Sequence, residues 1–360
     1  MTDLFSPWTV RGVTFPNRIG MSPMCMYSAH GDGMPNEWHT VHLTSHAIGG
    51  AGVVFVEATG VSPEGRITPG CLGIWSDEHA DALAPLARLI AEYGAVPGIQ
   101  LAHAGRKGGR TLAWEGNLPL SDDEWMPRIG PSPVAFKEGW AVPVEMDEAA
   151  IHRVVREFGD GARRAATAGF KILEAHFAHG YLMHQFLSPL SNFRSDAYGG
   201  SLENRARFPL MAVRAMRDAW PDDLPLSIRL SIIDWVPGGI TIEESIQVAR
   251  WMGEEGVDII DCSSGFVVPG EEMPPVPLYH GDLAQRVRAE AGVPTAVVGG
   301  IVRPEEAQQA IDEGMADLVL VGRAMLRDPY WARTAAVALG KHNPLEIPVQ
   351  YRRSVERLRD

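Results

Sequence analysis

A short apolar run follows a helix-like segment that ends in glycine, and this unit recurs along the chain. Glycine at such a position can adopt the left-handed conformation that closes a helix. Each following run is apolar without strict alternation, as expected for a strand that is buried on both faces. The glycines of these units are Gly52, Gly94, Gly169, Gly256, Gly292 and Gly314. Two further runs, "RIGMSPM" (18–24) and "LPLSIRL" (224–230), fit the pattern without a glycine.

Together these units predict about eight strands, most of them separated by a helix. Such a series favours a closed α/β barrel, the (β/α)8 TIM barrel, with parallel strands. A doubly wound open sheet is the alternative, although that architecture usually needs fewer units. The residues up to "VTFPNR" (13–18) are expected to form a hairpin that covers the bottom of the barrel. Residues 1–360 are therefore interpreted as a single domain.

Residues from about 105 to 145 break this rhythm, because they are rich in Gly, Pro, Trp and charged residues. Loops of this length in a compact domain tend to be functional lids or disordered segments. Since the segment follows the third predicted strand, we interpret it as a lid or pocket wall, with a plain surface insertion as the alternative. Residues from about 341 to 360 lie beyond the last predicted helix and form a charged tail.

The carboxyl ends of the strands are where such barrels place their active sites. Polar and small residues occupy these positions in the predicted units. In strand order they are Pro23, Met24, Cys25 and Tyr27; Glu57, Ala58 and Thr59; Gln100 and His103; His176, His179 and Tyr181; Arg229; Cys262, Ser263 and Ser264; Gly299 and Gly300; and Gly322 and Arg323. We expect these residues to surround one site.

The last two strand ends are typical of a phosphate site. Loops after the corresponding strands of such barrels often bind phosphate. Gly299, Gly300 and Gly322 let backbone N–H groups approach an anion closely. Arg323 opens a helical segment and can grip an anion with two hydrogen bonds.

Arg229 lies within a predicted strand, where a buried guanidinium is costly unless it is paired. One interpretation is a salt bridge to a nearby carboxylate. The other is contact with a negatively charged cofactor atom, such as N1 of a reduced flavin. The amide of Gln100 would suit the pyrimidine edge of the same ring. Cys25 is either a plain buried thiol or, beside Tyr27, part of this site.

The stretch "EAHFAHGYL" (174–182) holds His176 and His179 three residues apart, with Tyr181 two residues further on. The pair could bind zinc, fill the core or donate hydrogen bonds to an anionic oxygen. Zinc needs a third protein ligand, which the other strand ends do not obviously offer, so no metal is expected. A strand-end loop is a poor place for two desolvated imidazoles. We therefore favour stabilisation of a developing negative charge. His103 either supports the lid or accepts a backbone hydrogen bond, and we favour the structural interpretation.

Composition and charge exclude several classes of protein. The chain is 45% hydrophobic and 21% charged, which is ordinary for a globular protein. A formal net charge of -13 argues against nucleic acid as a partner. No apolar run is long enough to span a bilayer, and "MTDLFSPWTV" lacks the features of a signal peptide, so a cytoplasmic protein is expected. Cys25, Cys71 and Cys262 are too scattered for a disulfide framework or a four-cysteine iron–sulfur cluster.

Long motifs at the strand ends resemble the Old Yellow Enzyme family, most of all its bacterial, cysteine-containing branch of xenobiotic reductases and thermophilic-type ene-reductases. The motifs are "SPMCMYS", "EGRITPGCLGIWSDEH", "GIQLAHAGRK", "EAHFAHGYLMHQFLSPLSNFRSDAYGGSLENR", "VDIIDCSSG" and "VGRAMLRDP". The resemblance covers essentially the whole chain. It implies an NAD(P)H dehydrogenase that binds FMN and uses NADPH or NADH to reduce activated C=C bonds.

Carried over residue by residue, the resemblance implies that one group of residues surrounds the flavin. Ser22, Pro23, Met24 and Cys25 would line the flavin, and Ala58 and Gln100 would contact its ring. Arg229 would face the N1 side of the ring. The phosphate would be held by Gly299, Gly300, Gly322 and Arg323. Cys25 would lie near the reactive edge of the ring and tune its potential and the fit of the substrate.

The resemblance also implies a second group that handles the substrate, a small activated alkene such as an enone, a nitroalkene or a maleimide. His176 and His179 would bind its carbonyl oxygen, and Tyr27 would contact it. Hydride would pass from flavin N5 to the β-carbon. Tyr181 matches the residue that then donates a proton to the α-carbon.

The sequence departs from the family pattern in the stretch 111–128, which is longer than in compact members, and in the tail "VQYRRSVERLRD" (349–360). In several relatives an arginine shortly after the tyrosine enters a neighbouring subunit's active site. Arg353 is the first choice for this substrate-binding role and Arg352 the second. A homodimer or homotetramer is therefore expected.

Overall fold

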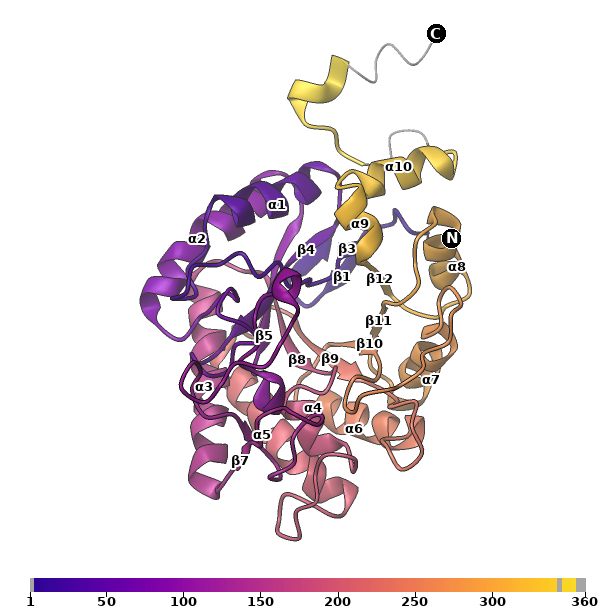
Figure 1. Cartoon of the computed structure of the whole chain (residues 1–360). Coiled ribbons are helices and arrows are strands. Elements are labelled where there is room, and N and C mark those ends of the chain that lie inside the picture. Colours follow the sequence, from indigo (N-terminus) through magenta and orange to yellow (C-terminus); the bar gives the residue numbers. More distant parts are fainter. Residues whose placement is uncertain (1–2, 342–344, 354–360) are drawn as a thin grey trace.

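Eight parallel strands close into one barrel within the part of the chain that this computed structural model describes, residues 3–341 and 345–353 (Figure 1). The barrel strands are β3 (Ile19–Met21), β4 (Val53–Gly60), β5 (Val96–Ala102), β8 (Ile172–Phe177), β9 (Leu226–Ser231), β10 (Ile259–Ser263), β11 (Thr295–Val297) and β12 (Leu318–Val321). Neighbours in the barrel follow chain order, and β12 pairs with β3 to close the ring. The predicted TIM barrel is confirmed, and the open sheet is excluded.

Helices form a ring around the strands (Figure 1). The outer helices are α1 (Glu37–Ile48), α2 (Asp77–Glu92), α3 (Glu148–Thr167), α5 (Leu202–Ala219), α6 (Ile242–Glu254), α7 (Gly281–Ala291), α8 (Pro304–Asp312) and α10 (Trp331–Ala338). The shorter α4 (Leu182–Leu187) and α9 (Arg323–Arg327) lie in the loops after β8 and β12. Among the described residues, none of these helices is both long and apolar enough to cross a membrane.

Buried strands and glycine-closed helices produce this fold, as the hydrophobic pattern predicts. Every residue of β4, β8 and β9 is buried. Gly94 and Gly169 adopt left-handed φ angles of 89° and 91° just after α2 and α3. The first unit differs from the prediction, because the left-handed residue after α1 is Gly50, with a φ of 93°. Gly52 serves another purpose: a Cβ there would lie 2.5 Å from the carbonyl oxygen of Asn17.

The first strands form the predicted hairpin and cover the amino-terminal end of the barrel. Strand β1 (Trp8–Val10) pairs antiparallel with β2 (Val13–Phe15). Arg11, in the turn between them, forms an ion pair with Asp258 at 2.6 Å. Asp258 immediately precedes β10, so this contact ties the hairpin to the end of the barrel opposite the strand termini.

The segment between β5 and α3 is folded onto the barrel. Its elements are η1 (Gly105–Lys107), η2 (Ala113–Glu115), β6 (Ile129–Gly130) and β7 (Val144–Glu145). The side chains of Trp125 and Trp140 are buried within it. Lys107 donates hydrogen bonds of 2.8 Å to the carbonyl oxygens of His179 and Phe266, in the loops after β8 and β10. The segment therefore lies over the carboxyl-terminal face of the barrel.

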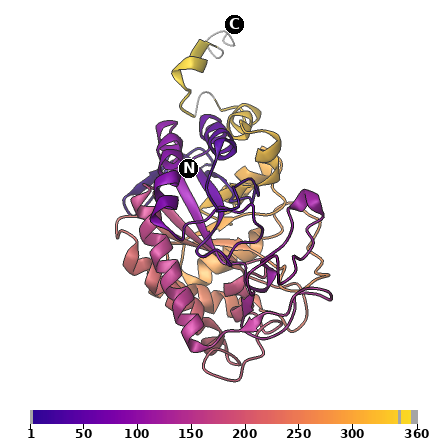
Figure 2. The same cartoon turned by 60° about the vertical axis from the view of Figure 1, so that its left-hand side comes forward.

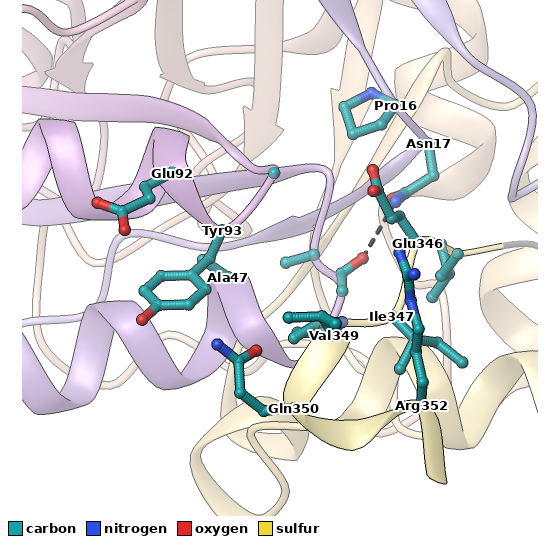
Figure 3. Close-up of a pocket in the computed structure, with 15 residues that line it drawn as sticks. Pro16, Asn17, Ala47, Glu92, Tyr93, Glu346, Ile347, Val349, Gln350 and Arg352 are labelled. Carbon is teal, nitrogen blue, oxygen red and sulfur yellow. Dashed lines mark hydrogen bonds between the residues drawn. The ribbon is translucent and has the colours of Figure 1, made fainter. Parts of the chain in front are cut away.

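The C-terminal segment leaves the body of the molecule beside α10 (Figures 1 and 2). It contains the short helix η3 (Val349–Tyr351). Its inner side bounds a hollow of about 420 Å³, opposite Pro16 and Asn17, where Val349 and Gln350 face the body (Figure 3). These contacts are with the amino-terminal side of β3, away from the carboxyl ends of the strands.

Candidate active site

A cavity of about 560 Å³ opens among the carboxyl ends of the barrel strands. Its volume lies within the range of cofactor and substrate pockets. The residues that the resemblance assigns to the flavin and the substrate all line this cavity, except Arg353 and its alternative Arg352. The other strand-end residues do not line it; they are Glu57, Thr59, His103, Cys262, Ser263 and Ser264. The sequence did not single out the other lining residues, which are Tyr279, Val298, Ile301, Val302, Leu320 and Arg327.

The loop after β3 presents Cys25 and Tyr27 to the cavity in a fixed conformation. A buried carboxylate holds the loop from behind, because Glu57 Oε2 accepts a hydrogen bond of 3.0 Å from the Met26 N–H. Tyr27 has a left-handed φ of 51°, which a residue with a side chain adopts only where its surroundings impose it. Burial raises the pKa of the Cys25 thiol well above its usual value, so Cys25 is a neutral thiol near neutral pH.

Arg229 projects from β9 and lines the cavity. Its Nη1 donates to Ser22 Oγ at 3.2 Å. Its Nε lies 3.2 Å from Asp261 Oδ2, although the two groups are not oriented for a hydrogen bond. Both interpretations of this residue are therefore compatible with the structure. Arg229 has a carboxylate neighbour, and it keeps a buried donor without a hydrogen-bond partner among the described residues.

A buried polar cluster beneath the cavity fixes the side chain of Gln100. Gln100 Nε2 donates to Glu174 Oε1 at 2.7 Å, and Ser227 Oγ donates to Glu174 Oε2 at 3.1 Å. Burial, and then the negative charge of Asp261, raise the pKa of Glu174 to about 8. Glu174 therefore retains a proton near neutral pH, which limits the negative charge inside the barrel.

The opposite end of the cavity is built from glycine-rich backbone. Gly299 and Gly300, in the loop after β11, have left-handed φ angles of 118° and 68°. Apart from its chain neighbours, the atom nearest to a Cβ on Gly322 would be Met24 Sδ, at 3.6 Å. A side chain would therefore fit here, and the glycine leaves open space instead. Arg323 follows with an exposed side chain and, among the described residues, no ion pair. The donors at this end suit an anion.

His176 and His179 converge at the other end. Nε2 of His176 lies 3.2 Å from Nδ1 of His179, and Nε2 of His179 lies 2.6 Å from Ser263 Oγ. Burial, and then the positive charge of Arg229, lower the pKa of both imidazoles well below the usual value. Both are therefore neutral near neutral pH. Ser263 was noted in the sequence only as a strand end; its contact with His179 depends on the tertiary structure.

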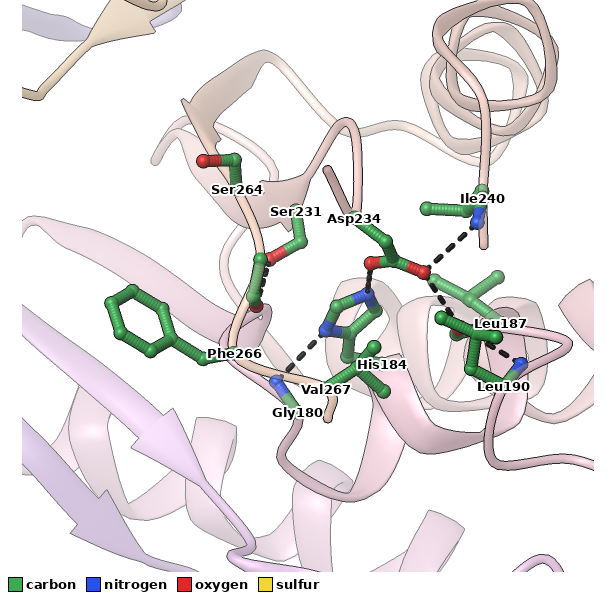
Figure 4. Close-up of polar contacts among 12 residues, drawn as sticks. Gly180, His184, Leu187, Leu190, Ser231, Asp234, Ile240, Ser264, Phe266 and Val267 are labelled. Carbon is green, nitrogen blue, oxygen red and sulfur yellow. Dashed lines mark hydrogen bonds and ion pairs between the residues drawn. The ribbon is translucent and has the colours of Figure 1, made fainter. Parts of the chain in front are cut away.

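A buried network of hydrogen bonds holds the loop that carries His179, Gly180 and Tyr181 (Figure 4). The Gly180 N–H donates to His184 Nδ1 at 2.8 Å, so His184 carries its proton on Nε2 and donates to Asp234 at 2.8 Å. His179 has a left-handed φ of 57°. The ring of Tyr181 lies 5.0 Å from that of His176, edge to face. Because this network fixes the loop, the side chains of His179 and Tyr181 stay at the cavity.

A second cluster of titratable residues lies outside the cavity. Glu64, His103 and Glu157 form the one grouping of potential metal ligands found among the described residues. Arg153 Nη1 already bridges the two carboxylates at 2.7 and 2.6 Å. His103 Nδ1 accepts a hydrogen bond from the Gly105 N–H at 3.1 Å, in keeping with its structural interpretation. His176 and His179 are not part of this cluster.

Arg353 does not reach the cavity of its own chain. The residue is exposed on the C-terminal segment, beyond the helix η3. Arg352 lies at the second hollow instead (Figure 3). Entry of either arginine into a neighbouring subunit stays a prediction.

Comparison with known proteins places these features in a family. Residues 3–342 match the sequence profile described as "NADH:flavin oxidoreductase / NADH oxidase family". The chain belongs to this family. The resemblance to Old Yellow Enzymes is thereby confirmed at the level of the family.

Relatives in this family match the chain along its length. It is 47% identical to an NADPH dehydrogenase of Geobacillus thermodenitrificans (strain NG80-2), over 98% of this chain and 98% of the relative. It is 46% identical to an NADPH dehydrogenase of Bacillus subtilis (strain 168), over 97% and 98%. The structure of an old yellow enzyme homologue from Zymomonas mobilis has a TM-score of 0.78 at 26% identity, covering 96% of this chain and 95% of the other. Morphinone reductase has a TM-score of 0.78 at 25% identity, covering 95% and 90%.

Proposed function

We propose that this protein is an FMN-dependent NADPH dehydrogenase of the cysteine-containing branch, which reduces activated C=C bonds of α,β-unsaturated carbonyl compounds. The observation that carries the proposal is the convergence of His176, His179 and Tyr181 at one end of a cavity whose other end is lined by Gly299, Gly300, Gly322 and Arg323. Relatives named NADPH dehydrogenase support the choice of reductant.

The residues present fit FMN. Arg229 offers a buried Nε without a hydrogen-bond partner among the described residues, which suits a negatively charged ring atom. Gln100 offers a fixed amide beside it. The loops at Gly299, Gly300 and Gly322, with Arg323, would hold the phosphate. When bound, FMN supplies hydride transfer between the nicotinamide and the alkene.

The histidine pair would bind the carbonyl oxygen of the acceptor. A neutral imidazole carries one N–H, and protons on Nε2 of His176 and Nδ1 of His179 would point both donors at one place. The carbonyl oxygen would replace their mutual hydrogen bond. In that arrangement the Ser263 hydroxyl donates to Nε2 of His179 and fixes its tautomer. Two such donors stabilise negative charge more in the transition state than in the substrate.

Tyr181 would supply the proton. Burial raises the pKa of Tyr181, and the nearby charge of Arg110 offsets only part of this rise, so the hydroxyl stays protonated near neutral pH. A protonated phenol at this position can act as a general acid toward the α-carbon. Burial also raises the pKa of Tyr27, which keeps that residue a neutral contact for the substrate.

The variant His176→Ala tests this assignment through the separate half-reactions of the FMN-loaded protein. We expect normal FMN content, weaker binding of a phenol and oxidation of reduced flavin by 2-cyclohexenone slowed by about 10²–10³, as for loss of one oxyanion donor. Reduction of the flavin by NADPH serves as the comparison. Loss of FMN from the variant, or an unchanged rate with 2-cyclohexenone, would contradict the assignment.

A further inference from the structure

The cavity at the carboxyl ends of the barrel strands is lined by positive charge only. Three arginines line it, Arg229, Arg323 and Arg327, and no Asp, Glu or Lys of the described residues does so. The chain as a whole is acidic, with a formal net charge of -13. Arginines that gather around a hollow without carboxylates indicate that it receives a ligand with several negative charges.

Arg327 is the member of this set to which the resemblance assigns no role. It is the last residue of α9 and follows Arg323 by four positions, which is about 6 Å along the helix axis. Residues with this spacing lie on the same face of a helix. Both guanidinium side chains therefore reach the cavity from one side, next to Gly322.

Arg327 has no partner within the part of the chain that the structure describes. Its side chain is exposed, and no hydrogen bond or ion pair to it is found there. The adjacent carboxylate, Asp328, serves other groups: it accepts from the Tyr330 N–H at 2.9 Å and from Thr334 Oγ1 at 2.8 Å. The guanidinium of Arg327 is therefore free to bind a ligand.

Charge balance points to the kind of ligand. Two like charges one helical turn apart repel each other, whereas an exposed arginine such as Arg88 pairs with a carboxylate one turn along, Glu92, at 2.9 Å. The repulsion between Arg323 and Arg327 is relieved when an anion lies between them. A phosphate monoester carries a charge of about −1.5 to −2 near neutral pH, which one guanidinium neutralises only in part. The third arginine, Arg229, faces the ring in the proposed function, where reduced flavin carries its own negative charge.

We propose that Arg327 binds the phosphate of FMN together with Arg323, so that two guanidiniums neutralise this dianion. The inference rests on the proposed function, in which Gly299, Gly300, Gly322 and Arg323 hold the phosphate, and it adds a second charged side chain to that site. A phosphate of the nicotinamide nucleotide has the same chemistry. The place of Arg327, inside the cavity and one helical turn from Arg323, favours the phosphate of the flavin.

The test compares FMN with riboflavin, which lacks the phosphate, in titrations of the full-length protein after its flavin has been removed. We expect the ratio of the dissociation constants, riboflavin over FMN, to fall by about 10- to 100-fold in Arg327→Gln, as for loss of a charge-assisted hydrogen bond. Arg327→Lys keeps the charge and should retain part of the preference for FMN. The matched control Arg156→Gln removes an exposed arginine of α3 that does not line the cavity, and it should preserve the ratio.

A second measurement leaves the flavin in place. The release of FMN from the loaded protein on dilution, followed by flavin fluorescence, should be faster in Arg327→Gln than in the wild type. In Arg156→Gln the rate of release should equal that of the wild type.

The possible results separate this inference from its alternatives. An unchanged ratio of dissociation constants overturns it. An equal loss of affinity for FMN and riboflavin assigns Arg327 a structural role and also overturns it. A higher KM for NADPH with the ratio unchanged assigns Arg327 to the nucleotide phosphate, with the same consequence. A wild-type protein that binds neither flavin refutes the proposed function itself.

Discussion

Asp234 anchors the network that holds the loop after β8 at Gly180, and the variant Asp234→Asn should reveal this (Figure 4). Asp234 is fully buried and accepts from His184 Nε2 at 2.8 Å, Ser188 Oγ at 2.6 Å and the Ile240 N–H at 2.9 Å. An asparagine keeps one acceptor oxygen and adds a donor. One of the three donors that Asp234 serves must then face an N–H group.

The expected loss of stability is about 1–3 kcal/mol, the cost of one buried polar group left without a partner. A change of tautomer at His184 would move the conflict to its Nδ1, which accepts from the Gly180 N–H. Gly180 lies between His179 and Tyr181, so the oxidation of reduced flavin by an enone should slow while FMN content stays normal. Chemical denaturation and the half-reactions measure the two effects.

The dependence on pH supplies an independent readout. Burial tends to raise the pKa of Asp234, yet His184 and the bonds from Ser188 and Ile240 leave that pKa below its usual value. The ionised carboxylate therefore contributes stability above the unfolded pKa of about 3.9, and this contribution disappears as the pH falls through the folded pKa. As the pH falls below about 4, the free energy of unfolding should therefore decrease less in the variant than in the wild type. If Asp234→Asn unfolds like the exposed control Asp218→Asn at every pH, the network does not hold the loop.

Three further substitutions test separate parts of the site. Tyr181→Phe should slow alkene reduction far more than flavin reduction by NADPH in stopped-flow experiments; equal slowing of both steps would remove it as the proton donor. Arg323→Ala should lower FMN retention on dialysis, because it removes a guanidinium that lines the cavity, and full retention would contradict the phosphate assignment. Gly299→Ala should destabilise the loop after β11, because a Cβ there would lie 2.7 Å from His280 Nδ1 at a φ of 118°; an unchanged melting temperature together with unchanged FMN affinity would show that this loop adapts.

The barrel could be predicted from the sequence because its signals are local. A helix that ends in a left-handed glycine and an apolar run that follows it are properties of adjacent residues, and Gly94 and Gly169 adopt the expected conformation. The first unit shows the limit of this logic. The pattern did not distinguish Gly50, which closes the helix, from Gly52, which makes room for Asn17 of a distant segment.

Most residues that line the cavity could also be predicted from the sequence, because the carboxyl ends of parallel strands meet at one face of a barrel. Arg327 could have been added, because it follows Arg323 by one helical turn. Tyr279 could not, since it lies in a long irregular segment whose side chains take their direction from tertiary contacts. The same holds for the hydrogen bond between Ser263 and His179, which joins the end of β10 to the loop after β8.

The compound that heat releases from the purified protein decides most directly whether FMN occupies the cavity. We expect a yellow protein that liberates one FMN per chain, identified by its mass, and that is bleached by NADPH and recoloured by 2-cyclohexenone without oxygen. A folded protein that is colourless and takes up no added FMN, or one that releases a different flavin, would contradict the assignment of Arg229, Gln100 and Arg323 to this cofactor.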